Sequence, residues 1–332
     1  MNSRRSIIMN QAPVLSSSEA IVDPQPGDLL PGVDLSGRDF SGRNLAGIDL
    51  SGANLAGTRF FRTNLSGANL AEANLEGAEF AGAYLSGANL EGCRAGRAGF
   101  GLARLEKASL FRADLHEASF SRANLSGANL HCVDLRQARI REATLTHCDL
   151  SEADMQQADL SLTCVRGANF SNADLRGARL RRLQGFKRAN WVGVDIRDIN
   201  FAGAYLMRRE IIDQNYIREF RSYNRLTALL YYPWWLTCDC GRSMLRWCFW
   251  IGIQAFFFAW LFTLTDVNYG DHATWLSPLY FSVVTLTTLG YGDVTPAGLS
   301  AQIVAMAEVT IGYIMLGGLL SIFSNKLARR GD

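Results

Sequence analysis

The sequence predicts a chain of two parts, a long β-solenoid followed by a helical membrane domain. An apolar residue recurs at every fifth position from Leu35 to Leu180, a period that fits neither a helix nor a flat strand. Two long apolar segments follow, at residues 247–264 and 299–323. Between them lies the glycine-rich stretch TLTTLGYGDVTP (285–296), in which glycine, threonine and tyrosine alternate beside an acid.

The five-residue repeat sets the architecture of the first part. Of thirty consecutive repeat centres, 29 are Leu, Phe, Ile, Val or Met, and Ala95 is the exception. The residue two positions before the centre is alanine in 20 of these repeats. Side chains two apart point the same way on an extended strand, so each repeat supplies one small and one large inward residue. A short extended step and a turn, repeated many times, give a solenoid filled by these side chains.

The repeat motif also resembles that of a known family. The repeats ANLSG, ADLRG and ANLEG resemble the A(D/N)LXX motif of pentapeptide-repeat proteins. The resemblance implies a right-handed quadrilateral β-helix with about twenty residues per coil and about nine coils. One extra residue after Leu180 shifts the register, and the pattern resumes at Phe186 and continues to Leu206.

Charge and cysteine content exclude several classes of protein. Residues 31–206 hold 21 Lys and Arg against 19 Asp and Glu, a nearly neutral balance. Some pentapeptide-repeat proteins mimic DNA and bind topoisomerases, which needs a sustained negative field, so we expect no such mimicry and no nucleic-acid partner. The seven cysteines show neither zinc-type pairs nor a disulfide framework, which indicates a reducing compartment. Cys238 and Cys240 are expected to be small buried thiols.

The segment 207–246 predicts a basic amphipathic helix. It holds seven arginines against four acids, with apolar residues at helical spacing. Its aromatic residues lead into the first apolar segment, a combination typical of a membrane–water boundary. Two interpretations stay open, because one helix can cap the end of the solenoid and also lie along a bilayer.

Both long apolar segments qualify as membrane spans. A transmembrane helix needs about 20 predominantly apolar residues, and residues 247–264 contain no charge. The segment between the spans has no basic residue, whereas basic residues flank the pair on its outer sides. These are Arg242, Arg246, Lys326, Arg329 and Arg330. The positive-inside rule therefore predicts a multi-pass protein with both termini, and the solenoid, in the cytoplasm.

The stretch between the spans predicts a short helix that stops at membrane depth. Residues 275–286 read as this helix, with Pro278 in its first turn, where its missing N–H costs nothing. Non-helical backbone at that depth survives only where protein surrounds it or an aqueous path runs beside it. Gly290 and Gly292 permit unusual dihedral angles, which can turn successive carbonyls toward one axis and replace the water shell of a cation. Residues 287–293 are therefore predicted to form a selectivity filter.

The order of helix, filter and second span is similar to that of bacterial two-helix potassium channels. The TVGYGD filter signature of that family is TLGYGD here, with Leu289 in place of valine and its side chain expected to point away from the pore. The resemblance implies that K⁺ is the permeant ion and that no other cofactor is needed. It implies that the carbonyls of Thr288, Leu289, Gly290 and Tyr291, with the Thr288 hydroxyl, bind K⁺.

Several residues are expected to support this site. The resemblance implies that Thr287, Tyr280 and Asp293 brace the filter, with Tyr280 hydrogen-bonded to Asp293. Gly312 lies where the potassium channel family has the gating hinge of its inner helix, and close helix packing at a small residue is an equal interpretation. Glu308, an acid within a span, is expected to make a structural hydrogen bond behind the short helix rather than an ion site.

The predicted function is a potassium-selective channel in the inner membrane of a bacterium. One filter segment supplies one quarter of a carbonyl ring, so the channel is predicted to be a homotetramer. No nucleophile–base constellation or metal cluster indicates an enzyme. The alternative is a membrane-anchored scaffold whose pore is closed or incidental, with the solenoid recruiting an unknown cytoplasmic partner.

The predicted parts of the chain follow one another in this order: a disordered lead (1–30), the solenoid (31–206), the linker helix (207–246), the pore domain (247–325, with outer helix 247–264, pore helix 275–286, filter 287–293 and inner helix 299–323) and a short cytoplasmic tail (326–332).

Overall fold

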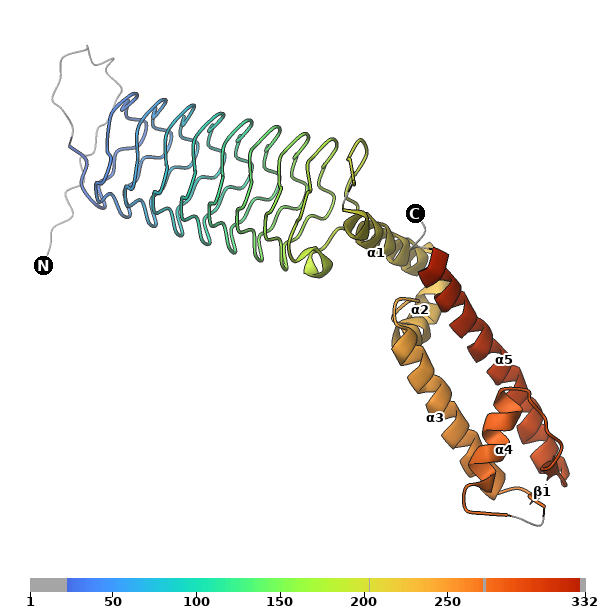
Figure 1. The fold of residues 1–332 in the computed structure, drawn as a ribbon. Helices are drawn as coiled ribbons and strands as arrows, with labels where there is room; N and C mark the ends of the chain where they lie inside the picture. Colours follow the sequence, from blue (N-terminus) through green and yellow to red (C-terminus); the bar gives the residue numbers. More distant parts are fainter. Residues whose placement is uncertain (1–22, 203, 271–272, 329–332) are drawn as a thin grey trace, which may run out of the picture. The chain divides into compact units, whose positions relative to one another are not determined.

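A computed structural model describes residues 23–202, 204–270 and 273–328 of the chain, drawn in Figure 1. The chain divides into two compact units, with the boundary between Arg218 and Glu219. Residues 1–22 of the predicted lead, and Arg329 and Arg330 of the predicted basic flank, lie outside the described residues. The prediction that the disordered lead extends to residue 30 was wrong, because Leu29 already forms a β-bridge with Asp49 of the solenoid.

The first unit is a solenoid of parallel β-bridges. Nearly all bridges join residues twenty positions apart, for example Asp34 with Asn54 and Asn54 with Asn74. Because each repeat is five residues long, four repeats close one coil, and the coil has four sides. The predicted β-helix is therefore confirmed. Figure 1 shows the coils stacked side by side along this unit.

The turn of each repeat explains the motif. The amide of Ala53 donates to the carbonyl of Leu50 at 3.1 Å, and Gly52 between them has a φ of +63°. The side chain of Asp34 accepts from the amide of Ser36 at 3.0 Å, which fixes the start of the turn. The side-chain amide of Asn54 donates to Asp34 Oδ1 on the neighbouring coil at 3.0 Å. Asp and Asn side chains therefore stabilise both the turn and the stacking of coils.

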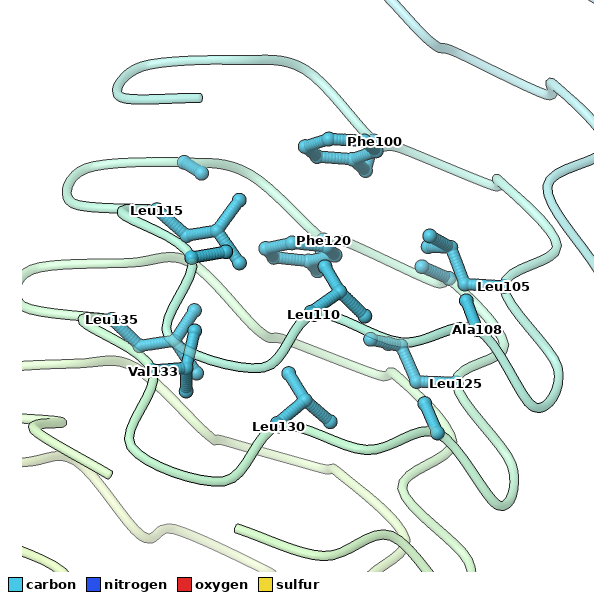
Figure 2. Close-up of a cluster of buried hydrophobic side chains, with 14 of the residues drawn as sticks. Phe100, Leu105, Ala108, Leu110, Leu115, Phe120, Leu125, Leu130, Val133 and Leu135 are labelled. Atoms are coloured by element: carbon cyan, nitrogen blue, oxygen red, sulfur yellow. The ribbon is translucent and has the colours of Figure 1, made fainter. Parts of the chain in front are cut away.

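The interior is filled by columns of like side chains. Consecutive rings along the column of Phe60, Phe80, Phe100 and Phe120 stack at centroid distances of 4.8 to 4.9 Å. Figure 2 shows Phe100 in register with Phe120, and Leu110 and Leu115 matched by Leu130 and Leu135 one coil on. Thr58 occupies one of the inward positions that usually hold a small residue. Its buried hydroxyl donates a hydrogen bond to the Leu35 carbonyl at 3.0 Å.

The extra residue after Leu180 is absorbed at one corner. The bridge partner of Cys164 is Gln184, twenty residues on, but that of Asn169 is Asn190, 21 residues on. A 3₁₀ turn, η1 (Phe186–Arg188), follows Gly185 at this point. The Trp191 indole N–H donates to the Phe186 carbonyl at 2.8 Å, which holds the widened corner closed.

Helix α1 (Tyr205–Tyr223) closes the end of the solenoid. Met207 and Ile211 are buried in the solenoid core. The Trp191 amide donates to the Gln214 side chain at 2.8 Å, and the Gly193 amide donates to the Asn215 side chain at 2.7 Å. These side chains satisfy backbone groups that the next coil would otherwise have paired, so the predicted capping role is confirmed.

The prediction of one linker helix was wrong, because the segment forms two helices. Helix α1 ends at Tyr223, and α2 (Arg225–Cys238) begins after Asn224. The Asn224 side chain accepts from the Thr227 amide at 2.8 Å, and the Thr227 hydroxyl accepts from the Asn224 amide at 3.0 Å. This reciprocal capping box starts a new helix rather than continuing the old one. Cys238 is buried and Cys240 is partly exposed, and both are free thiols.

The second unit is built from helices joined by one short sheet. The remaining elements are α3 (Met244–Thr263), β1 (Val267–Asn268), α4 (Ser277–Leu286), β2 (Thr295–Pro296) and α5 (Leu299–Ala328). Strands β1 and β2 pair antiparallel. Phe258 and Phe262 of α3 pack with Phe281 of α4, and the rings of Phe262 and Phe281 lie 4.6 Å apart. The predicted order of elements is present, with α3 beginning before residue 247 and α5 continuing past residue 323.

Truncating the stacked column should destabilise the solenoid far more than truncating its surface. Phe100→Ala removes a fully buried ring and should lower the free energy of unfolding by about 3–5 kcal/mol. Leu102→Ala, on the same turn, is the matched control because Leu102 is 62% exposed, and it should change stability by less than about 0.5 kcal/mol. Urea unfolding of the full-length protein, followed by circular dichroism, measures both. Equal losses would contradict the column as the source of stability.

Candidate ion-conduction site

Helix α4 ends in a capping motif that starts the predicted filter. The Leu289 amide donates to the Val284 carbonyl at 3.0 Å, and the Thr288 amide donates to the Thr285 carbonyl at 3.1 Å. These two hydrogen bonds form a Schellman motif, in which the residue directly after the helix C-cap adopts a left-handed conformation. Thr288 supplies it, with a φ of +59°. A threonine in this conformation is uncommon, and the two backbone hydrogen bonds to α4 hold the turn in place.

The sign of φ then alternates along the predicted filter. Thr288, Gly290 and Gly292 have φ of +59°, +50° and +79°, whereas Leu289 and Tyr291 between them have ordinary negative φ. In a regular strand all residues share similar dihedral angles, and successive carbonyls point to opposite sides. Alternating the sign of φ removes that reversal, so successive carbonyls can face one side. This is the backbone geometry that a column of carbonyl ligands requires.

The predicted hydrogen bond between Tyr280 and Asp293 is present. The Tyr280 hydroxyl donates to Asp293 Oδ2 at 2.7 Å. Tyr280 lies on α4 and Asp293 directly follows GYG, so the bond joins α4 to the last residue of the filter segment. Thr287 donates from its hydroxyl to the Val283 carbonyl at 2.7 Å, which ties its side chain back to α4 rather than to the filter.

Glu308 makes the predicted hydrogen bond behind α4. It is fully buried on α5, and its Oε1 accepts from the Ser282 hydroxyl of α4. The Ser282 hydroxyl also lies 2.8 Å from the Ala255 carbonyl of α3. These three groups form a small polar contact among all three helices. Glu308 Oε2 is buried without a hydrogen-bond partner among the described residues.

Gly312 lies against the end of α4. A Cβ built on Gly312 would stand 2.8 Å from the Leu286 carbonyl oxygen and 3.3 Å from the Leu286 Cα. Leu286 is the last residue of α4, immediately before the predicted filter. The close-packing interpretation of Gly312 is therefore supported by this contact, and the hinge interpretation stays a prediction.

A second close contact between helices was not predicted from the sequence. The Trp247 indole N–H on α3 donates to the Met315 carbonyl on α5 at 2.7 Å. A Cβ on Gly318 would meet the Trp247 ring at 2.4 Å. The tryptophan thus lies on a surface of α5 that only glycine leaves open. The sequence signal was the Gly317–Gly318 pair in the second span.

Most of the filter is exposed within its own chain. Leu289 and Tyr291 are 58% and 67% exposed, and the glycines between them are exposed. The two long apolar helices are also mostly exposed within the chain. Only 22% of an apolar 18-residue stretch of α3, and 11% of such a stretch of α5, is buried. Both helices are long and apolar enough to cross a membrane, by length and composition.

Two family models match the chain. Residues 247–329 match the ion channel family, and eight copies of the pentapeptide repeat match in the N-terminal part. The repeat matches cover residues 30–67, 58–94, 103–141, 128–167 and 138–182.

Known relatives resemble the ion channel part over short stretches. The chain is 44% identical over 57 residues to two pore potassium channel b of Oryza sativa subsp. japonica, covering 17% of this chain and 16% of that one. It is 32% identical over 74 residues to the calcium-gated potassium channel TvoK of Thermoplasma volcanium, covering 21% of each. It is 38% identical over 80 residues to protein LctB of Geobacillus stearothermophilus, covering 20% of this chain and 58% of that one. The chain thus spans less than two thirds of each of these relatives.

Solved pentapeptide-repeat structures resemble the solenoid. HetL of the cyanobacterium Nostoc sp. strain PCC 7120 is 29% identical with a TM-score of 0.32, covering 52% of this chain and 88% of its own. The fluoroquinolone resistance protein QnrB1 is 24% identical with a TM-score of 0.40, covering 55% and 94%. By the two family matches, the chain carries pentapeptide repeats in its N-terminal part and an ion channel domain at its C-terminus.

Proposed function

We propose that this chain is the subunit of a homotetrameric potassium-selective channel with a cytoplasmic solenoid on each subunit. The observation that carries the proposal is the alternation of φ through residues 288–292, directly after the capped end of α4. This geometry supports passive ion transport, because carbonyls that replace the hydration shell of a cation let it pass without a chemical step.

The exposure of the filter supports a tetramer. In a single chain the side chains of Leu289 and Tyr291 are largely exposed. One column of carbonyls would surround an ion on one side only. Fourfold cyclic symmetry supplies the other three columns and covers these side chains. Large apolar residues on α5 are also exposed in the single chain, and subunit contacts or lipid would cover them. These residues are Leu299, Ile303, Met306, Ile311, Tyr313, Ile314 and Leu320.

Potassium is the proposed ion because of the filter sequence and the relatives. The segment TLGYGD supplies the carbonyls of Thr288, Leu289, Gly290 and Tyr291 as ligands. Relatives over this region include proteins described as potassium channels. Leucine for valine at position 289 changes a side chain and leaves the backbone carbonyl in place. Tyr280 and Asp293 then brace the filter from behind through their hydrogen bond.

We place the proposed channel in the inner membrane of a bacterium with α3 and α5 as its two spans. Arg242 before α3 and Arg246 in its first turn favour a cytoplasmic start, and no basic residue lies between the spans. Helix α2 exposes aromatic and apolar side chains next to Arg221, whose guanidinium lies 5.1 Å from the ring centre of Tyr231. Such residues favour the membrane–water boundary.

The solenoid is proposed to serve assembly, regulation or partner docking rather than conduction. Its interior is filled by buried Leu, Phe and Ala side chains, which leaves no path for an ion. Its nearly neutral charge gives no reason to expect a nucleic-acid partner.

Ion flux from liposomes tests the proposed function. Purified full-length protein in K⁺-loaded vesicles should release K⁺, and matched Na⁺-loaded vesicles should release far less. Equal release of both ions would contradict the filter assignment. No release of either ion under any condition would favour the alternative of a membrane-anchored scaffold with a closed or incidental pore.

Gly290→Ala should abolish selectivity. A Cβ at a φ of +50° is strained, and relief of that strain turns the carbonyls away from the pore axis. The ratio of K⁺ to Na⁺ flux should fall to about one, or flux should stop. Gly252→Ala is the matched control, because Gly252 on α3 has ordinary dihedral angles and open space for a Cβ. Retained selectivity in the Gly290 variant would count against the proposal.

Gly312→Ala should disturb the filter through α4. The added methyl group must displace the Leu286 carbonyl, at a packing cost of about 1–3 kcal/mol. We expect a lower ratio of K⁺ to Na⁺ flux, measured in the same liposomes. Gly317→Ala, on the same helix with nothing within 4 Å of its Cβ, should behave as the native protein. An unchanged ratio with altered total flux would instead favour the hinge interpretation.

Removal of the solenoid should leave selectivity intact. The first part of α1 packs on the solenoid, so a chain that begins at Glu219 separates the two units at their natural boundary. This chain should still form K⁺-selective tetramers, as measured by cross-linking and liposome flux. Intact tetramers with equal K⁺ and Na⁺ flux would show that the solenoid shapes the filter.

A further inference from the structure

Three side chains with metal-binding atoms meet on the surface of the solenoid. His131 and Cys132 lie on one turn, and Glu152 lies on the turn of the next coil. Cys132 Sγ is 3.3 Å from His131 Nε2 and 3.6 Å from Glu152 Oε2. The imidazole nitrogen, sulfur and carboxylate oxygen all lie within 4.8 Å of one another.

The other nitrogen of the histidine is held by the backbone. His131 Nδ1 lies 3.0 Å from the Ser151 carbonyl oxygen and 2.9 Å from the Ser151 hydroxyl. A carbonyl can only accept, so this contact places the ring hydrogen on Nδ1 and leaves a lone pair on Nε2, facing Cys132. A ligand histidine whose second nitrogen donates to a backbone carbonyl is the usual arrangement in metal sites. The ring of Phe111 stacks on the imidazole at 5.6 Å and fixes its plane.

The distances match the spacing of ligands around zinc. With Zn–S near 2.3 Å and Zn–N near 2.0 Å, neighbouring ligand atoms of a tetrahedral site are about 3.5 Å apart. The two measured separations, 3.3 and 3.6 Å, bracket that value. We propose that His131, Cys132 and Glu152 bind one zinc ion, with water at the fourth position. A thiolate and an imidazole select zinc over the hard cations Mg²⁺ and Ca²⁺.

The fold holds these ligands in place without the metal. The Cys132 amide donates to the Ser151 carbonyl at 3.0 Å, the same carbonyl that accepts from His131. One backbone bond between coils therefore fixes both turns relative to each other. A thiolate and a carboxylate balance the two charges of the ion. Arg112, on the preceding coil, is the nearby cation; its guanidinium lies 4.9 Å from the ring centre of Phe111. Its charge favours the thiolate and opposes the metal, so it weakens the site without removing a ligand.

The metal alone tests the site, independently of channel activity. Full-length protein in detergent, reduced and without a histidine tag, is titrated with Zn²⁺ against a chromophoric zinc chelator. We expect one Zn²⁺ per chain, and a fall in affinity of at least about 100-fold in Cys132→Ser, because loss of an outer-shell partner alone costs 10–100-fold. Glu152→Gln should weaken binding as well. Co²⁺ in place of Zn²⁺ should give a thiolate charge-transfer band that Cys132→Ser lacks.

Matched controls come from the same solenoid. Cys164→Ser removes another partly exposed thiol, and His147→Gln removes another surface histidine, and neither residue belongs to the cluster. Both variants should bind zinc as the native protein does. The proposal is overturned if the native chain binds no zinc, if Cys132→Ser and Glu152→Gln bind as tightly as the native chain, or if the control variants lose binding to the same extent.

Discussion

The left-handed residue at the end of α4 is the constraint on which the candidate ion-conduction site depends. Thr288 holds a positive φ without the freedom of glycine, and two backbone hydrogen bonds to α4 keep it there. From that point the sign of φ alternates through Gly292, which allows successive carbonyls to face one side. The helix must therefore be rigid where it ends. Buried contacts supply that rigidity, through Phe281 against α3 and Ser282 against Glu308.

A different constraint governs the solenoid, where one repeat length determines the backbone pairing, the stacking of core side chains and the alignment of polar side chains. The same twenty-residue offset pairs the backbones, stacks the phenylalanines and lines up the asparagine and aspartate side chains. Each coil contacts only its neighbours, so the ends are the weak points of such a fold. Helix α1 covers one end with apolar residues and amides. At this end, side chains of α1 supply the hydrogen-bond partners that a further coil would otherwise provide.

The sequence predicted what depends on period and spacing. Five-residue periodicity predicted the coil, and the resemblance to potassium channels implied the hydrogen bond between Tyr280 and Asp293. Contacts that depend on the packing of particular surfaces were missed, such as Trp247 on Gly318. The histidine–cysteine–glutamate cluster was missed for another reason. Known zinc motifs place their ligands a few residues apart along the chain. In this solenoid Glu152 lies twenty residues after Cys132, one coil away.

Two glycines of α5 contact two different helices. Gly312 touches the backbone of α4 beside the filter, and Gly318 lies beneath Trp247 of α3. A bend of α5 between them would have to separate Trp247 from Gly318 and break its hydrogen bond to Met315, while the contact at Gly312 stayed in place. Because interfaces packed this closely have few intermediate arrangements, such a bend would be a change between two discrete states. The filter end of α5 would then keep its geometry while the other end moved.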